Sequence, residues 1–141
     1  MSEESTTPDL VEFTRQSIDA FSRRDLDAVM GFYAPGAVWD ASQPGVGVFE
    51  GRAAIRAFLG DWLALYEEFE IELEEVLDLG HRVVFSVTHQ NARLVGSAGS
   101  VRETYAATTE FGSEGLVARV VLAQDIDEAR TAAERLAQER G

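Results

Sequence analysis

The sequence predicts a single α+β domain over residues 1–141, a cone-shaped α+β barrel in which N-terminal helices pack into a strongly curved, mixed, mostly antiparallel sheet and a C-terminal helix follows. A chain of 141 residues can bury one core without disulfides. Apolar residues first recur with a helical spacing and, from residue 69, with a spacing of two. The extended segments are also longer than the usual ~6 residues, so they must bend to cover the helices.

Capping signals mark the first two helices. Thr7, followed by Pro and Asp, predicts a helix that runs to about Ser22, because proline suits the first helical position and an acid stabilises the first turn. Residues 1–6 before it are expected to be disordered. Asp25 predicts the cap of a second helix, whose inward face includes Tyr33. The Pro-Gly pair that follows is expected to end that helix.

Two short extended segments and a third helix come next. We expect a strand over 37–41 and a second extended piece over 48–51, separated by a Gly- and Pro-containing turn. Gly51 then leads into a third helix with a strong apolar face. Two aromatic residues of that face, Phe58 and Trp62, are candidate ligand-binding residues.

The second half of the chain alternates with the period of strands. From residue 69, apolar residues alternate with glutamates, which predicts a half-exposed antiparallel strand. Further strands are expected over 82–96, 101–111 and 116–122, separated by Gly-containing turns. Asp125, with Glu128 three residues later, forms a capping box that predicts a last helix over 125–139.

Glu75 interrupts this alternation, because its position matches that of the apolar residues Ile71 and Leu73. Strict alternation would bury its carboxylate, which is costly without a partner. A β-bulge at residues 74–75 would instead turn it outward. The bulge is the less costly of the two arrangements, and we favour it.

Composition narrows the function classes. The formal net charge is −13, with 25 Asp and Glu against 12 Lys and Arg. Such a field repels phosphate backbones and anionic lipid, so we expect neither nucleic acid nor a membrane as a partner. No apolar run approaches the ~20 residues that span a bilayer, and the acidic start is unlike a signal peptide, which makes a cytoplasmic location the expectation. The absence of cysteine and the wide separation of the two histidines predict no metal site.

Four segments carry a family resemblance: Arg24–Ala28, Phe32–Asp40, Phe49–Ile55 and Gly80–Val84. Through them the chain resembles the nuclear transport factor 2-like superfamily, in its SnoaL-like (polyketide cyclase) and ketosteroid-isomerase-like branch. The resemblance covers nearly the whole chain. It implies a cone with an apolar pocket for a small apolar molecule, and a homodimer paired through the sheet, which suits the final strand because it is apolar on both faces. Isomerases, cyclases, epoxide hydrolases, dehydratases and non-catalytic binders all share this fold.

The catalytic set of ketosteroid isomerases is matched only in part. In that family an Asp base acts with a Tyr and a protonated Asp that hold the oxyanion. The resemblance places Asp40 at the position of the base, at the end of the first strand. The Tyr position falls at or near Ser17, and the protonated-Asp position at or near Ala107. Steroid isomerisation is therefore not expected, and the paired Arg and Asp of limonene-epoxide-hydrolase-like members are unmatched as well.

Asp40 is the first catalytic candidate. A carboxylate at the mouth of an apolar pocket would be desolvated, and its pKa would rise toward that of a useful base. Alternatively, Asp40 forms an Asx turn with the backbone of residues 41–43. Its neighbour Trp39 points to the opposite face of a regular strand, so both line the pocket only if a twist or bulge intervenes. The resemblance favours Trp39 as an aromatic, ligand-binding wall, and plain core packing explains it equally well.

The long strands carry the other candidates. His89 is expected on the apolar face of its strand, either as a general acid or base or as a hydrogen-bonded core or interface residue. Tyr105 is expected to face inward, where it and Thr109 can donate hydrogen bonds to a ligand oxygen. Glu103 would then be a second carboxylate near the rim. The Gly/Ser hairpin tip leaves the register between His89 and Tyr105 open.

Two functions fit these observations. The first is a cofactor-independent enzyme that isomerises, cyclises or dehydrates a small apolar carbonyl or polyketide-like compound. In it Asp40 is the base, and His89 or Tyr105 donates to the developing oxyanion. The second is a non-catalytic ligand-binding or dimerisation module with the same pocket. An Asp40 inside the cavity would support the enzyme, whereas an Asp40 turned to solvent and capping the turn would rule out that mechanism.

Overall fold

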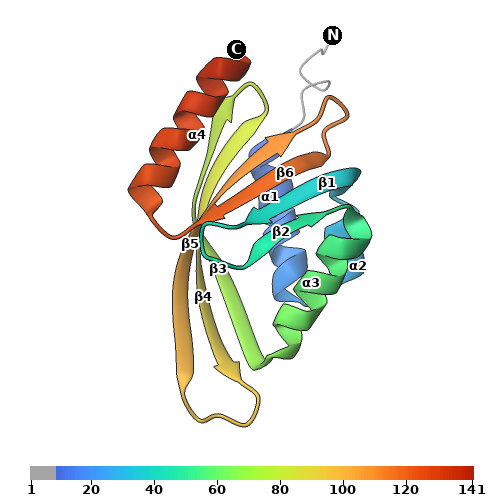
Figure 1. The fold of residues 1–141 in the computed structure, drawn as a ribbon, viewed down its shortest axis with the longest axis vertical. Coiled ribbons are helices and arrows are strands. Elements are labelled where there is room, and N and C mark those ends of the chain that lie inside the picture. Colours follow the sequence, from blue (N-terminus) through green and yellow to red (C-terminus); the bar gives the residue numbers. More distant parts are fainter. Residues whose placement is uncertain (1–8) are drawn as a thin grey trace.

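The computed structural model describes residues 9–141, which form four helices and six strands (Figure 1). Along the chain they are α1 (Leu10–Ser22), α2 (Leu26–Met30), β1 (Tyr33–Ala41), β2 (Gly47–Glu50), α3 (Arg52–Ala64), β3 (Tyr66–Gly80), β4 (Val83–Leu94), β5 (Ser100–Phe111), β6 (Val117–Ala123) and α4 (Ile126–Arg140). The predicted cap at Thr7 and the predicted disorder of residues 1–6 lie outside the described residues. Within them Asp9 caps α1, because its carboxylate accepts a hydrogen bond from the backbone N–H of Glu12 at 3.1 Å.

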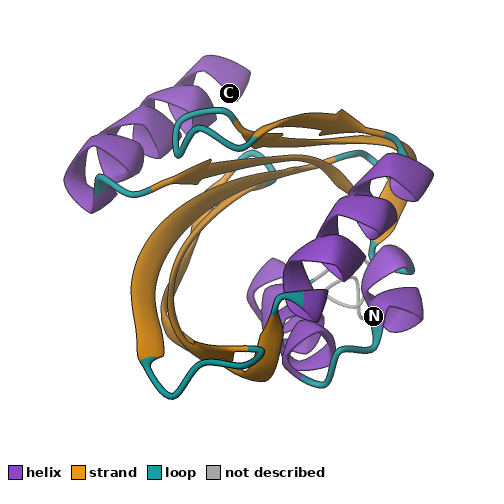
Figure 2. Cartoon of the chain, turned by 60° about the horizontal axis from the view of Figure 1, so that its bottom comes forward, coloured by secondary structure: helices purple, strands orange, loops and turns teal. Residues whose placement is uncertain are grey.

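The strands form one sheet in the order β2-β1-β6-β5-β4-β3. β1 runs parallel to β6, and the other neighbouring strands are antiparallel. Figure 2 shows the sheet curling around the N-terminal helices without closing into a barrel, with the C-terminal helix on its other side. The predicted α+β cone with a mixed, mostly antiparallel sheet and a C-terminal helix is therefore confirmed, and the barrel that the sheet forms stays open.

The predicted second helix is too long, because it was expected to include Tyr33. α2 ends at Met30, and Tyr33 begins β1 instead of continuing the helical face. The backbone explains this, because the N–H of Val117 in β6 donates to the carbonyl of Phe32 at 2.9 Å and draws the chain into the sheet. The register of β1 against β6 shifts between Tyr33 and Val38. Pro35 falls within this irregular stretch, where its missing N–H disrupts no regular ladder.

Helix α4 covers the outer face of the sheet over β3, β4 and β5. Phe85 and Val87 of β4 and Ala106 of β5 pack against Ala133 of α4, and all four side chains are buried. β4 is thus buried on both faces, since its opposite face meets the helices inside the cone. The apolar side of β4 faces α4, and the side that carries hydroxyl groups faces inward.

The bulge predicted at Glu75 is confirmed. The register of β3 against β4 shifts between Leu73 and Glu75, which places Glu75 on the outer face. There Arg130 of α4 donates two hydrogen bonds to its carboxylate, at 2.8 and 2.9 Å. The Arg130 guanidinium also lies 4.9 Å from the centre of the Phe85 ring. A residue that alternation alone would have buried therefore anchors α4 to the sheet.

The homodimer through the sheet stays a prediction. α4 covers part of the outer face over β3, β4 and β5, so any pairing of two copies through this face would use the part that the helix leaves open. Among residues 9–141, no helix is long and apolar enough to cross a membrane.

Candidate functional site

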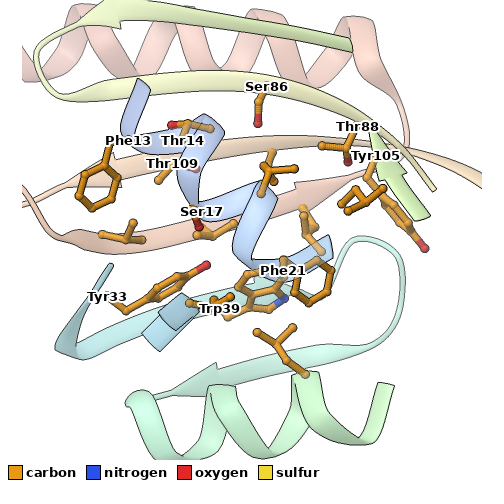
Figure 3. Close-up of a pocket in the computed structure, with 18 of the residues that line it drawn as sticks. Phe13, Thr14, Ser17, Phe21, Tyr33, Trp39, Ser86, Thr88, Tyr105 and Thr109 are labelled. Atoms are coloured by element: carbon orange, nitrogen blue, oxygen red, sulfur yellow. The ribbon is translucent and has the colours of Figure 1, made fainter. Parts of the chain in front are cut away.

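A cavity of about 90 Å³ lies between the N-terminal helices and the concave face of the sheet. α1, α2 and α3 supply one side, and β1, β3, β4, β5 and β6 supply the other. Its volume is several times what one water molecule needs. An apolar groove of about 370 Å³ shares Trp62, Tyr105 and Leu122 with the cavity, and the two spaces together can hold a small organic molecule. Figure 3 shows side chains from both sides converging on this space.

The wall of this cavity carries no charge. Among the described residues, those that line it include no Asp, Glu, His, Lys or Arg. Its two titratable side chains are the tyrosines Tyr33 and Tyr105, and burial raises the pKa of both above the ordinary value, so both stay neutral. An uncharged wall disfavours an ionic occupant, because an unpaired ion pays a large desolvation penalty there.

Aromatic rings form much of the wall. Phe13 of α1 meets Phe111 of β5 edge to face, with ring centres 5.3 Å apart. The ring centres of Phe21 in α1 and Trp62 in α3 lie 6.2 Å apart. On β1, the rings of Tyr33 and Trp39 stack with centres 6.4 Å apart. Trp39 and Trp62, two of the residues predicted to bind a ligand, both line the cavity.

Hydroxyl groups of β4 and β5 form the polar part of the wall. Ser86, Thr88 and Gln90 alternate along β4 and all face the cavity. The register pairs Thr88 with Tyr105, and Thr109 also lines the cavity. Sequence reasoning missed Ser86 and Thr88, because it turned the apolar face of this strand inward. The amphipathic final helix could have indicated the correct orientation of the strand, since such a helix needs an apolar surface of the sheet on which to pack.

Tyr33 is the other residue that sequence reasoning missed. Its side chain is only 5% exposed and lines the cavity. In Figure 3 its hydroxyl points into the cavity, toward the side of Ser17 on α1. The indole Nε1 of the neighbouring Trp39 is buried and has no hydrogen-bond partner within residues 9–141. β1 thus brings a phenol and an indole to the same wall.

Asp40 lies outside the cavity, on the face of β1 opposite to Trp39. Its carboxylate accepts hydrogen bonds from the hydroxyl and the backbone N–H of Ser42, the latter at 3.0 Å, and from Arg119 of β6 at 2.8 Å. The Ser42 bonds, and then the Arg119 charge, hold the pKa of Asp40 below its ordinary value, against the effect of burial. The expected rise in this pKa is therefore wrong, and the alternative Asx turn is what the structure contains.

His89 also lies away from the cavity. It follows the part of β4 that α4 covers, and its side chain is 45% exposed on the outer face. Its Nδ1 lies 2.8 Å from the hydroxyl of Thr104, and its Nε2 pairs with Glu74 of β3. The structure therefore does not bring His89 together with Asp40 or Tyr105 at one site.

The remaining candidates lie in the cavity wall or next to it. Tyr105 lines the cavity, and its hydroxyl donates to Glu103 at 2.8 Å. Glu103 also accepts from the side-chain amide of Gln124 at 3.3 Å and lies outside the cavity wall. Phe58 stacks on Phe49, with ring centres 4.2 Å apart, and lines a separate apolar groove that shares Trp62 and Tyr105 with the cavity. No group of three or more potential metal ligands occurs within residues 9–141.

Comparison with known protein families identifies a SnoaL-like domain. The model of the SnoaL-like domain matches residues 14–120, which run from α1 into β6 and leave out α4. No curated protein matches the chain.

Solved structures share the fold at low sequence identity. An NTF2-like protein of unknown function from Burkholderia pseudomallei has 21% identity and a TM-score of 0.73, over 89% of this chain and 97% of that one. A putative SnoaL-like polyketide cyclase from Shewanella putrefaciens has 15% identity and a TM-score of 0.68, over 94% and 98%. An epoxide hydrolase/cyclase-like enzyme of pyran ring formation in the polyether salinomycin has 17% identity and a TM-score of 0.69, over 82% and 90%. These likenesses show the fold.

Proposed function

The chain belongs to the SnoaL-like domain family, and from that premise we propose that it binds a neutral, largely apolar small molecule in the cavity under α1. One observation carries the proposal: the described residues that line the cavity include no charged side chain. Aromatic rings and aliphatic side chains supply most of the contact area, and hydroxyl groups supply the polar contacts. Such walls are typical of sites for small organic ligands.

The catalytic mechanism with Asp40 as base is not part of this proposal. A general base must reach the proton it abstracts, and Asp40 is held on the outer face by Arg119 and Ser42. Its lowered pKa also makes it a weaker base than an ordinary carboxylate. The alternative of a ligand-binding module, which the sequence left open, is the better supported of the two.

Filling the cavity tests this function. Ala107 lines the cavity in the middle of β5, whereas Ala118 of β6 lies outside its wall. We expect the bicyclic hydrocarbon indane to bind the wild-type protein with one site per chain, as measured by titration calorimetry. Ala107→Phe should abolish this binding, and the matched control Ala118→Phe should keep it. Binding that survives Ala107→Phe would show that the ligand sits elsewhere.

One observation favours a second, catalytic function at the cavity mouth. The hydroxyl of Tyr105, which lines the cavity, is hydrogen-bonded to the carboxylate of Glu103. Glu103 lies outside the cavity wall, so it would act through Tyr105: the Tyr105 hydroxyl passes its proton to Glu103 as it takes one from the carbon beside a ligand carbonyl, and the reverse transfer returns it. The reaction supported in this way is proton exchange or isomerisation next to a carbonyl.

Deuterium exchange separates binding from catalysis. In D2O, an enzyme of this kind would speed the exchange of the protons at C2 of 1-indanone beyond the rate in buffer. The Glu103→Gln variant would lose that acceleration while still binding the ketone. If the wild-type protein exchanges these protons no faster than buffer does, the catalytic function is wrong and ligand binding remains.

A further inference from the structure

An apolar groove of about 370 Å³ adjoins the cavity, and we infer that it is a second part of the binding site, which holds an unbranched alkyl chain of the ligand. The ligand class is then a neutral compound with a compact ring system in the cavity and an alkyl chain in the groove. The inference rests on the proposed function, because it concerns the same bound molecule.

The volume of the cavity is the first argument. It measures about 90 Å³, whereas pockets for small organic molecules measure roughly 300 to 1,000 Å³. The neighbouring groove is several times larger, at about 370 Å³. A ligand of ordinary size therefore fills the cavity with one part only, and its remainder extends beyond the cavity wall.

Three side chains line both spaces and join them: Trp62 of α3, Tyr105 of β5 and Leu122 of β6. The rings of Trp62 and Tyr105 meet edge to face, with centres 6.4 Å apart. The indole N–H of Trp62 donates to the hydroxyl of Tyr66 at 3.3 Å. The hydroxyl of Tyr105 donates to Glu103 at 2.8 Å, and in Figure 3 it points away from the cavity. These contacts make the junction narrow, so an unbranched chain fits it better than a branched group.

The wall of the groove suits an alkyl chain. Val46, which lies between β1 and β2, and Leu65, which follows α3, both line it. These side chains are 51% and 55% exposed, so more than half of each contacts water. A chain that covers them removes apolar surface from water, which is favourable. Asp61 is the only charged residue among the described residues of this wall, and it disfavours a chain that ends in a carboxylate.

Three probes test the inference: indane, 5-butylindane and 5-tert-butylindane, whose branched group has the same number of carbons as the butyl chain. Titration calorimetry of the wild-type protein should show 5-butylindane binding at least about tenfold more tightly than indane, since each fully buried methylene group contributes about fourfold. The branched isomer should gain about threefold or less, because it does not fit the junction.

Val46→Asn tests where the chain lies, and Val48→Asn is the matched control. Val48 is 53% exposed, much like Val46, and it lines neither the groove nor the cavity. Both side chains are exposed, so both variants should fold. Val46→Asn should reduce the gain from the butyl chain to about threefold or less and leave the affinity for indane unchanged. Val48→Asn should leave both quantities as they are in the wild-type protein.

An NMR measurement on the wild-type protein does not depend on any variant. With 13C-labelled Val and Leu methyl groups, the terminal methyl protons of bound 5-butylindane should give NOEs to the methyl groups of Val46 and Leu65, and none to those of Val48. NOEs to Val48 in place of these would overturn the inference.

The titrations separate the failure of the inference from that of the proposed function. An equal gain for the two isomers, or a gain that persists in Val46→Asn, would overturn the groove as the site of the chain and leave ligand binding in place. A gain that falls as the protein concentration rises would mean that a second copy of the chain occupies the groove, and it would also overturn the inference. If none of the three probes binds, both the inference and the proposed function are wrong.

Discussion

The guanidinium of Arg119 lies 2.8 Å from the carboxylate of Asp40, on the face of the sheet that turns away from the cavity. Trp39, one residue earlier on β1, lines the cavity. The alternation of a single strand therefore places the aromatic wall inside and the carboxylate outside. This separation leaves the cavity with neutral groups alone and gives Asp40 a structural role.

Replacing Asp40 should affect stability and leave ligand binding unchanged. Asp40→Asn removes the charge that pairs with Arg119 and weakens the hydrogen bonds from Ser42. Because Arg119 is partly exposed, we expect a loss of roughly 1 kcal/mol in the free energy of unfolding, measured with urea at pH 7. The affinity for indane should stay within about twofold of wild type. A large loss of affinity for indane without a loss of stability would show that Asp40 contributes to ligand binding.

The contribution of Asp40 should also depend on pH. Its pKa in the folded protein is below the ordinary value, so the folded state binds the proton less readily than the unfolded state does. The stabilisation is therefore fully present above about pH 4, the ordinary aspartate pKa, and is lost as the pH falls through the lowered value. Urea titrations of wild type and Asp40→Asn should therefore converge as the pH falls below this lowered pKa. A difference that grows on acidification would contradict this sign.

The contact between α4 and β4 can be tested with two adjacent alanines. Ala133 is 1% exposed against Phe85 and Val87, whereas Ala132 is exposed. Ala133→Asp places an unpaired carboxylate in this contact and should cost about 3 kcal/mol or more of unfolding free energy. Ala132→Asp, on the exposed side of the same helix, should change it by less than about 0.5 kcal/mol. Equal effects would mean that α4 does not pack on the sheet in this way.

The hydroxyl of Thr88 should be dispensable for stability, since it lies in the cavity wall without a hydrogen bond to the rest of residues 9–141. Thr88→Val keeps the shape of the side chain and should leave the free energy of unfolding unchanged or raise it by up to ~1 kcal/mol. Thr14→Val is the control, because the Thr14 hydroxyl donates to the carbonyl of Leu10 and its loss should be destabilising. A marked loss in Thr88→Val would reveal a partner for that hydroxyl.

The fold could be predicted because the capping residues, the spacing of apolar residues and the cost of burying charge all indicate the same helices and strands. Capping residues such as Asp25 and Asp125 begin helices as expected, and each carboxylate accepts the backbone hydrogen bond that a cap requires. The change of period near residue 69 separates the helices from the long strands. The bulge at Glu75 followed from the penalty for burying a carboxylate, and the register of β3 contains it.

The site was harder to predict, because it depends on which face of each strand turns inward. β4 has an apolar face and a face with hydroxyl groups, and the sequence alone favours burial of the apolar one. α4 provides a second apolar surface, so Phe85 turns to that helix and Ser86 to the cavity. Tyr33 was assigned to a helix because local pattern does not contain the contact that starts β1. That contact is a hydrogen bond between the backbones of Val117 and Phe32, which lie far apart in the sequence. Local pattern contains neither piece of information.

With no charged side chain among the described residues of its wall, the cavity should bind neutral ligands and exclude charged ones. Titration calorimetry of the wild-type protein at pH 7 with indane and with indane-2-carboxylate tests it most directly, since the two ligands share the same rings and differ in one ionised group. We expect saturable binding of indane with one site per chain, and binding of the carboxylate weaker by about a hundredfold, because the described part of the cavity wall offers no positive partner. Equal or tighter binding of the carboxylate would contradict it.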